Sequence, residues 1–290
     1  MISIVIPTYN RAEVLKRTLD SIYLQSFKEW ECLIVDDYST DDTEGTVKLY
    51  TKKDPRFLFL KNIRKKGAQG ARNTGILAAK GEWIVLFDSD NVMQESFLLK
   101  ISRIMNDEYG VINTWSNVLD SKTSERLRGF NWVNNGDIHQ KLLTGKCYVD
   151  NSSTAIRKKF LFDIGLLAED CPAFQEWDTH LRISTLAKYR TLEDYLVDYY
   201  SGAADSISSD RQKDVKGYIY ILGKYRDIWL QKAPFHFIRY CAIMTMFLDK
   251  LTEVQRQQFT TKYKEIVGVY TPVVRLLTLV LKYKQKKHGN

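Results

Sequence analysis

Four short apolar runs near the start of the chain, separated by helix-forming segments, constrain its fold more than any other feature. Between the first two runs, Leu15, Leu19 and Ile22 recur at helical spacing, and we expect Asn10 to cap that helix. Alternating strands and helices form right-handed crossovers, so an α/β fold is predicted, with a mainly parallel, Rossmann-like sheet flanked by helices. The runs are ISIVIP (2–7), ECLIVDD (31–37), FLFLKN (57–62) and EWIVLFD (82–88).

Polar clusters follow three of these four runs. In open α/β sheets, ligands bind outside the carboxyl ends of the strands. Because parallel strands end at the same edge, we expect the three clusters to gather on one rim of the sheet. They are Thr8-Tyr9-Asn10, Asp36-Asp37 and Asp88-Ser89-Asp90.

The net charge of +8 is unevenly distributed. Residues 211–290 contain 16 Lys and Arg against 5 Asp and Glu, whereas residues 1–210 contain 27 against 30. This pattern argues against a nucleic-acid-binding catalytic body and favours a C-terminal segment that meets an acidic partner.

Cysteine spacing and hydropathy bear on the compartment. The four cysteines lie far apart without zinc-site spacing, which favours a reduced, cytosolic compartment. The apolar run at residues 2–7 is too short for a signal peptide. No stretch of about 20 uninterrupted apolar residues occurs, so no membrane-spanning helix is predicted.

The Asp88-Ser89-Asp90 turn can present two carboxylates to one divalent cation. Hard oxygen ligands suit Mg²⁺ or Mn²⁺, which proteins often hold by one or two carboxylates together with substrate phosphates. Alone, such a turn is more typical of solvated loops and helix caps. Because the turn follows a buried strand and Asp36-Asp37 is expected beside it, we favour a metal-binding role over a solvated turn.

The other two polar clusters, with a nearby arginine, suggest a nucleotide. Asp37 or Asp36 could accept a hydrogen bond from a uracil N3–H, and Tyr9 could stack on the base. The alternative is that the acidic pair caps the following helix. Arg72 and Asn73 open a helix after a glycine loop, where phosphate oxygens could bind; a surface arginine without a role is equally consistent.

Four ordered segments resemble the family 2 inverting glycosyltransferases, which have the GT-A fold. The resemblance is strong over residues 1–100, weaker to about 205, and absent after 210. Those segments are VIPTYNR (5–11), VDDYSTDDT (35–43), GAQGARNTGI (67–76) and FDSD (87–90).

The resemblance implies roles for six residues of the rim. Pro7, Tyr9 and Asp37 would hold the nucleotide base, and Arg72 would act near the base or diphosphate. Asp88 would contact the ribose or the metal. The principal metal ligand would be Asp90, with Mn²⁺ or Mg²⁺ as the cofactor.

The family's catalytic base corresponds to Glu176, within Gln175-Glu176-Trp177-Asp178, and Asp178 could share the role. In a single displacement, this carboxylate would take the proton of the acceptor hydroxyl as the hydroxyl attacks the anomeric carbon. From the residues alone, Glu176 is an ordinary acid at a helix N-terminus. Some relatives carry a metal-approaching His within the stretch that matches 199–210, which has none here; Asp205 is the available carboxylate.

The implied organisation has three parts. Residues 1–105 would form the nucleotide-sugar-binding half of a GT-A domain, 106–205 its acceptor-side half, and 206–290 a basic helical extension. The implied activity is metal-dependent transfer of a hexose from a nucleotide-sugar, with UDP as the expected carrier, to a glycan or lipid-linked acceptor. A non-catalytic binding protein and a sugar nucleotidyltransferase are the alternatives.

The segment TPVVRLLTLVLKYKQKK (271–287) is amphipathic and Lys-rich. Such a helix can lie in an anionic membrane interface, which would place a cytoplasmic enzyme peripherally at the inner face of the membrane. Packing against the catalytic body is an equally good interpretation.

Overall fold

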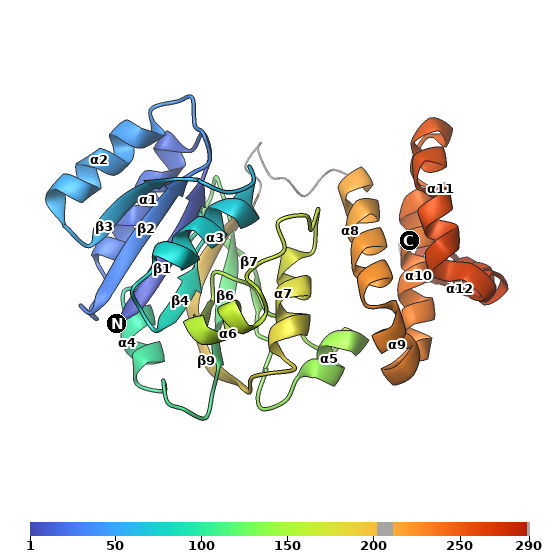
Figure 1. Ribbon diagram of the computed structural model, residues 1–290. Helices are drawn as coiled ribbons and strands as arrows, with labels where there is room; N and C mark the ends of the chain where they lie inside the picture. Colours follow the sequence, from blue (N-terminus) through green and yellow to red (C-terminus); the bar gives the residue numbers. More distant parts are fainter. Residues whose placement is uncertain (202–210, 289–290) are drawn as a thin grey trace. The chain divides into compact units, whose positions relative to one another are not determined.

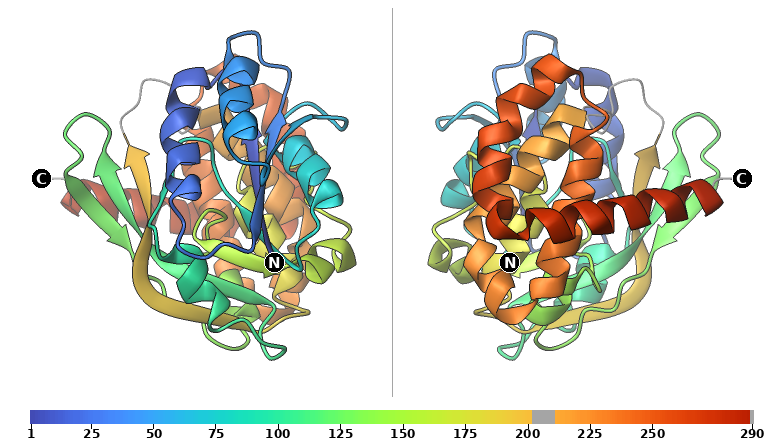
Figure 2. Two further views of the ribbon diagram at one scale, coloured as in Figure 1. Left: turned by 90° about the vertical axis from the view of Figure 1, so that its left-hand side faces the viewer. Right: turned by 90° about the vertical axis from the view of Figure 1, so that its right-hand side faces the viewer.

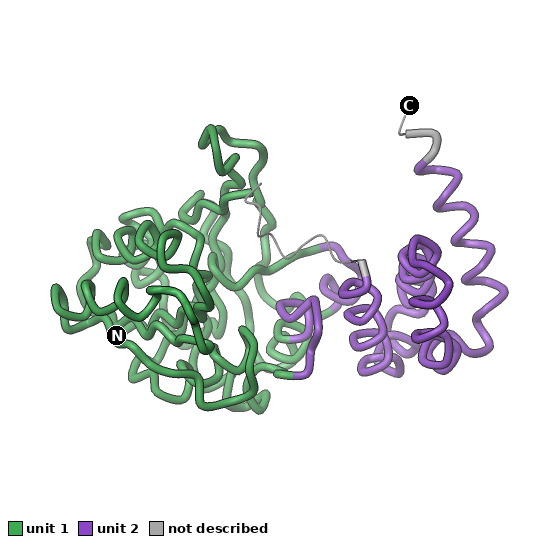
Figure 3. Tube along the Cα trace, turned by 90° about the horizontal axis from the view of Figure 1, so that it is seen from above, with its two compact units in different colours: residues 1–139, 147–169, 179–206 green, residues 140–146, 170–178, 207–290 purple. Residues whose placement is uncertain are grey.

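The computed structural model describes residues 1–201 and 211–288, which form two compact units (Figure 3). The sheet unit consists of the described residues within 1–139, 147–169 and 179–206. The helical unit consists of those within 140–146, 170–178 and 207–290. Residues 140–146 and 170–178, expected in the acceptor-side half, thus belong to the helical unit.

One nine-stranded sheet forms the centre of the sheet unit, in the order β3-β2-β1-β4-β8-β6-β9-β5, with β7 paired to β6 (Figure 1). β1, β2, β3 and β4 are mutually parallel neighbours, as predicted, while β8 pairs antiparallel with both β4 and β6. The strands are β1 (Ile2–Thr8), β2 (Trp30–Asp36), β3 (Phe57–Lys61), β4 (Trp83–Leu86), β5 (Val92–Met93), β6 (Val111–Asp120), β7 (Arg126–Phe130), β8 (Thr154–Arg157) and β9 (Tyr189–Ser201).

The register brings three strand ends to one rim. Thr8 at the end of β1 pairs with Asp36 at the end of β2, and Val5 pairs with Leu86 at the end of β4. Phe87 continues this alignment by donating its N–H to the carbonyl of Val5 at 2.9 Å. The expected convergence of the strand ends is therefore present.

Helices cover both faces of the parallel half (Figure 1). On one face, α1 (Ala12–Tyr23) and α2 (Thr43–Lys53) pack against alternate β-branched residues such as Ile4 and Ile6. On the other face, α3 (Ala68–Ala78) approaches Val5 and Val35 through Gly75, where a Cβ would lie 2.4 Å from a Val5 methyl. This close approach requires glycine.

Shorter helices connect the second half of the sheet. The segment that follows β8 folds back to α3 because Asn73 bonds the Leu167 backbone through both its amide oxygen (3.0 Å) and its amide nitrogen (2.9 Å). These helices are α4 (Phe97–Ser102), α5 (His139–Thr144), α6 (Lys158–Asp163) and α7 (Gln175–Ile183).

Aromatic packing explains why two short segments join the helical unit. The Trp177 ring lies 5.4 Å from Trp229 and 5.0 Å from Tyr240, and the Trp229 indole donates to the Leu143 carbonyl at 2.9 Å. The remaining helices of this unit are α8 (Arg211–Lys224), α9 (Arg226–Lys232), α10 (Pro234–Leu248), α11 (Glu253–Val267), the 3-10 turn η2 (Gly268–Tyr270) and α12 (Thr271–His288).

One segment of the helical unit is long and apolar enough to cross a membrane, which the sequence analysis did not predict. Within Glu253–Gln285, an 18-residue window has a mean hydropathy of 1.5, and 22% of that window is buried. The segment bends at η2, where Gly268 has a φ of 51°, so α11 and α12 run in different directions (Figure 2). The comparison with a membrane-spanning segment rests on length and composition alone.

Candidate active site

The turn after β4 holds Asp88 against a buried arginine. Nη2 of Arg72 lies 2.5 Å from Oδ1 of Asp88, and Nη1 of Arg72 donates to Gln69 at 2.7 Å. The backbone N–H of Asp88 donates to Oγ of Ser152 at 3.1 Å, and the Asn91 amide donates to the same oxygen at 2.9 Å. Asp88 is therefore fixed on both its backbone and its side chain.

Asp90 is surrounded by cations from α1 and the loop before it. Nη1 of Arg11 lies 3.8 Å from its carboxylate, and Arg17 donates to its backbone carbonyl at 3.0 Å. Desolvation and then the charge of Asp88 raise the pKa of Asp90. Two carboxylates that disfavour each other's charge suit a site for a cation.

The donor set of this turn fits a divalent cation shared with a substrate. Asp88 and Asp90 are both partly exposed and offer hard oxygen ligands. Within residues 1–201 and 211–288, no three His, Cys, Asp or Glu side chains gather to hold a metal by themselves. Further ligands would come from donor phosphates and water, which is the usual arrangement for Mg²⁺.

Asp37 lies at the end of β2 and organises the loop before α3. Its carboxylate accepts hydrogen bonds from the Asn62 amide at 2.6 Å and from the Gly67 backbone N–H at 2.8 Å. An ionised carboxylate has about four acceptor positions, so Asp37 keeps capacity for a third donor.

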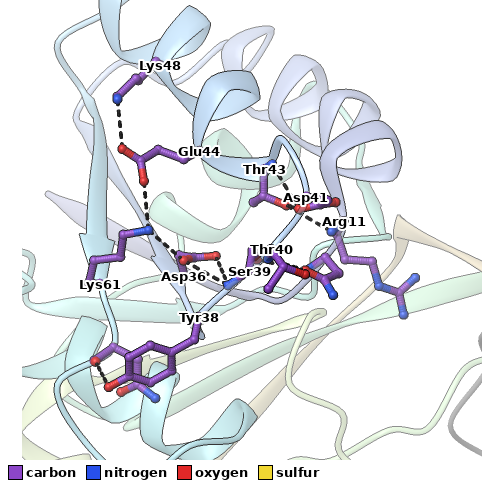
Figure 4. Close-up of polar contacts among 12 residues, drawn as sticks. Arg11, Asp36, Tyr38, Ser39, Thr40, Asp41, Thr43, Glu44, Lys48 and Lys61 are labelled. Carbon is purple, nitrogen blue, oxygen red and sulfur yellow. Dashed lines mark hydrogen bonds and ion pairs between the residues drawn. The ribbon is translucent and has the colours of Figure 1, made fainter.

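Its neighbour Asp36 is fully buried and has a structural role. Asp36 accepts from Lys61 at 3.0 Å and from the Ser39 N–H at 3.3 Å, and Lys61 also pairs with Glu44 at 2.9 Å (Figure 4). These contacts tie β2, β3 and α2 together at the rim. Asp37, the other member of the pair, is thus better placed for a ligand.

Tyr9 and Pro7 occupy different positions at the end of β1. Tyr9 is 46% exposed, with the Lys66 ammonium 4.9 Å from the centroid of its ring. Pro7 is buried within β1, in register with Val35. Tyr9 can therefore stack on a base, and the buried Pro7 fixes the strand that presents it.

The expectation that Asn10 caps α1 is wrong. Asn10 has a φ of 50°, and its amide oxygen accepts from the Thr40 N–H at 2.8 Å. The helix begins at Ala12, whose N–H donates to Asp41 at 3.1 Å. The Arg11 N–H donates to Thr43 at 3.1 Å (Figure 4). The N-terminus of α1 is thus capped by Asp41, in the loop after β2, and by Thr43, the first residue of α2.

The prediction that Arg72 and Asn73 open a helix is also wrong, because α3 begins one turn earlier, at Ala68. Asn73 is buried and is held by Leu167 and by Glu169, which accepts from its amide at 2.8 Å. It therefore has a packing role. Arg72 remains available to the site because it faces Asp88.

Sequence reasoning missed Asp150, whose carboxylate accepts from the Ser153 N–H at 2.8 Å, the Ser153 hydroxyl at 2.6 Å and the Tyr199 hydroxyl. Desolvation raises its pKa most, and the charge of Asp88 adds to the effect. Burial, and then the charges of Asp150 and Asp88, raise the pKa of Tyr199, so these groups share one electrostatic environment. No motif in the sequence marks Asp150.

Glu176 and Asp178 belong to the helical unit and have different environments. Glu176 is half-buried in the first turn of α7. Asp178 is buried, and its Oδ1 accepts from Lys224 and from the Tyr225 hydroxyl, both at 2.7 Å. Asp178 thereby joins α7 to the last residue of α8, Lys224, and to Tyr225, which follows α8.

His180 is a packed residue. It is fully buried, its Nδ1 lies 3.0 Å from the Tyr189 hydroxyl, and desolvation lowers its pKa to about 3. Asp205, the carboxylate considered as a further metal ligand, lies outside the described residues.

Comparison with known proteins gives relatives of one kind. A curated relative from Campylobacter jejuni, GalNAc(5)-diNAcBac-PP-undecaprenol beta-1,3-glucosyltransferase, is 32% identical over 44% of this chain and 41% of its own. An Escherichia coli relative, UDP-Glc:alpha-D-GlcNAc-diphosphoundecaprenol beta-1,3-glucosyltransferase, is 36% identical over 39% of this chain and 47% of its own. The matches thus span less than half the length of these relatives.

Solved structures share the fold at low identity. S. aureus TarS 1–349 in complex with UDP-GlcNAc has a TM-score of 0.69 at 16% identity, over 92% of this chain and 79% of that one. A mannosyltransferase from Pyrobaculum calidifontis in complex with GDP-Man and Mn²⁺ has a TM-score of 0.60 at 19% identity, over 97% and 84%. The predicted GT-A fold is confirmed.

The model of the family "Glycosyl transferase family 2" matches residues 3–165, more than half of the chain and the whole rim of β1, β2 and β4. The chain belongs to glycosyltransferase family 2.

Proposed function

We propose that this protein transfers a hexose from a UDP-sugar to a lipid-linked or glycan acceptor, with inversion at the anomeric carbon. The observation that carries the proposal is the rim of the sheet, where Asp37 follows β2 and Asp88 and Asp90 follow β4, facing Arg72 and Arg11. Base-binding, phosphate-binding and cation-binding groups thus come from adjacent parallel strands and their loops.

The nucleotide end of the donor would meet Tyr9 and Asp37. Tyr9 offers an exposed ring for stacking, and Asp37 keeps an acceptor position for the N3–H of a uracil. UDP is favoured as the carrier because TarS, a structural neighbour, is known in complex with UDP-GlcNAc and with UDP.

The diphosphate would lie against Arg72 and the Asp88-Ser89-Asp90 turn. Nε of Arg72 is buried and has no hydrogen-bond partner among the described residues, and a phosphate oxygen bound here would supply one. Asp90, supported by Asp88, would hold Mn²⁺ or Mg²⁺, which neutralises the charge that grows on the departing diphosphate.

Glu176 is the proposed general base. The acceptor oxygen forms a bond to the anomeric carbon, the bond to the diphosphate oxygen breaks with its electron pair on that oxygen, and Glu176 takes the hydroxyl proton. Asp178 suits this role less well because Lys224 and Tyr225 already occupy its buried carboxylate. We assign it the positioning of α7.

The proposed acceptor class is based on relatives. The Campylobacter and Escherichia relatives carry names that specify diphospho-undecaprenol-linked acceptors. A lipid-linked acceptor here would place the enzyme at the cytoplasmic face of a membrane, as a peripheral protein.

The experiment is a transfer assay of the full chain with UDP-sugars and a polyprenyl-diphosphate-linked acceptor. Asp90→Ala should reduce Mn²⁺-dependent turnover at least about 100-fold with an unchanged melting temperature. Asp107→Ala, which removes a fully exposed carboxylate paired with Arg157, serves as the control. Unchanged turnover in Asp90→Ala would remove the metal from the proposal.

A further inference from the structure

An exposed apolar stripe runs along α12. By helical geometry its members cover an arc of roughly 120° on one side of the helix. Isolated apolar residues are normal on a surface, but a continuous stripe marks an interaction site. This outer stripe consists of Val273, Leu276, Leu279, Val280 and Tyr283, which are 51%, 65%, 65%, 43% and 70% exposed.

The opposite face of α12 is packed within the helical unit. Val274 and Thr278 are 0% and 4% exposed, and the Thr278 hydroxyl donates to the Val274 carbonyl. Lys282 forms an ion pair with Asp249, the residue that follows α10, at 2.6 Å. The helix is thus attached along one side, and the outer stripe points away from its own unit.

The charged residues of α12 itself are all basic. Residues 266–290 contain five Lys and Arg and no Asp or Glu. Arg275 and Lys284 are exposed, and helical geometry puts them on opposite edges of the outer stripe. Basic side chains on both edges of an apolar face are the arrangement that anionic headgroups neutralise.

We propose that the outer stripe of α12 docks on an anionic bilayer and lies in the plane of its interface. The apolar part of α12, residues 271–281, rises only about 17 Å, roughly half of a hydrocarbon core of about 30 Å. Its packed face and the bend at η2 keep it on the helical unit. A second copy of the chain fits less well, because pairing two stripes would bring basic edges together.

The test is co-sedimentation of the full chain with vesicles of phosphatidylcholine and phosphatidylglycerol at 70:30, against pure phosphatidylcholine. The double variant Leu276→Gln/Leu279→Gln should bind the anionic vesicles at least about 30-fold more weakly. Leu49→Gln is the matched control, because Leu49 is 64% exposed on α2 of the sheet unit, and its binding should equal wild type.

Charge and self-association complete the test. Arg275→Gln/Lys284→Gln should weaken binding to the anionic vesicles about tenfold or more, and 0.5 M salt should weaken wild type likewise. Equal binding by wild type and Leu276→Gln/Leu279→Gln would overturn the proposal. So would a wild-type dimer that binds no vesicles and that this double variant makes monomeric in sedimentation velocity.

This inference is independent of the proposed reaction. The vesicles contain neither donor nor acceptor, so binding is measured without turnover. Transfer to a water-soluble acceptor needs no membrane and should survive in Leu276→Gln/Leu279→Gln. A negative result in the vesicle assay therefore leaves the proposed reaction intact, and a negative result in the transfer assay leaves the membrane proposal intact.

Discussion

The guanidinium of Arg72 and the carboxylate of Asp88 lie 2.5 Å apart, joining α3 to the turn after β4. Arg72 is 7% exposed at its side chain and Asp88 34%, so the arginine is the buried support and the carboxylate faces the rim. In the proposed site, Arg72 would both orient Asp88 and contact a phosphate, and so link the cation-binding carboxylates to the nucleotide.

Arg72→Gln should lower the affinity for the nucleotide-sugar by about 10- to 100-fold, because a charge-assisted hydrogen bond contributes about 1.5–3 kcal/mol. Isothermal titration with UDP and Mn²⁺ measures the change. Arg157→Gln is the control, since Arg157 also pairs with carboxylates, Glu82 and Asp107, but lies away from the rim. Equal losses in both variants would argue for a general effect on the fold.

Glu176→Gln and Asp178→Asn should affect different quantities. Glu176→Gln is expected to reduce kcat about 100-fold or more and to leave donor affinity unchanged, because a general base contributes about 10²–10⁴. Asp178→Asn removes the charge that Lys224 and Tyr225 share, and should lower the free energy of unfolding by about 1–2 kcal/mol. Turnover assays and urea unfolding separate the two effects. If kcat falls only in Asp178→Asn, Asp178 is the general base and Glu176 is not.

His180 should make stability depend on pH. Burial lowers its pKa to about 3, so between about pH 6.5 and 3 the unfolded chain binds a proton that the folded chain excludes. Stability is then retained above pH 6.5 and falls as the pH drops, by about 1.4 kcal/mol per unit. His180→Gln should flatten this component between pH 7 and pH 5 in urea unfolding. If the difference in the free energy of unfolding between pH 7 and pH 5 is the same in wild type and His180→Gln, His180 is not the source of the pH dependence.

Gly75 should resist substitution. A Cβ on α3 at this position would lie 2.4 Å from Val5 and 3.2 Å from Val35, so Gly75→Ala is expected to destabilise the protein by about 1–3 kcal/mol. Gly223→Ala, in α8, provides the contrast because its Cβ would meet no atom closer than 3.7 Å among those described. That variant should be neutral or stabilising by up to about 1 kcal/mol.

The parallel half of the fold could be predicted because its signal is local. Buried β-branched runs such as residues 2–7 and 82–88 alternate with helical periodicity, and the crossover rule then orders the strands. The positions of Asp37, Asp88 and Asp90 follow from those strand ends. Their convergence on one rim could be predicted without knowledge of contacts between distant segments.

What the sequence could not reveal depends on contacts between distant segments. Asn10 is a good capping residue by type, but a positive φ turns its amide oxygen to Thr40, and Asp41 caps α1 instead. Asp150 could not be recognised because its partner Tyr199 comes from β9, which is distant in the sequence. Likewise, packing on α10 decides which apolar side of α12 is buried.

The most direct test of the donor site is the thermal stability of the full chain with UDP and Mn²⁺, because a ligand that binds only the native state raises the melting temperature. Wild type should be stabilised by UDP with Mn²⁺ and much less by UDP with EDTA. Asp37→Asn should lose most of the UDP-dependent shift, and Asp90→Ala only its Mn²⁺-dependent part. A wild-type shift that both variants retain would contradict a donor site built from the ends of β2 and β4.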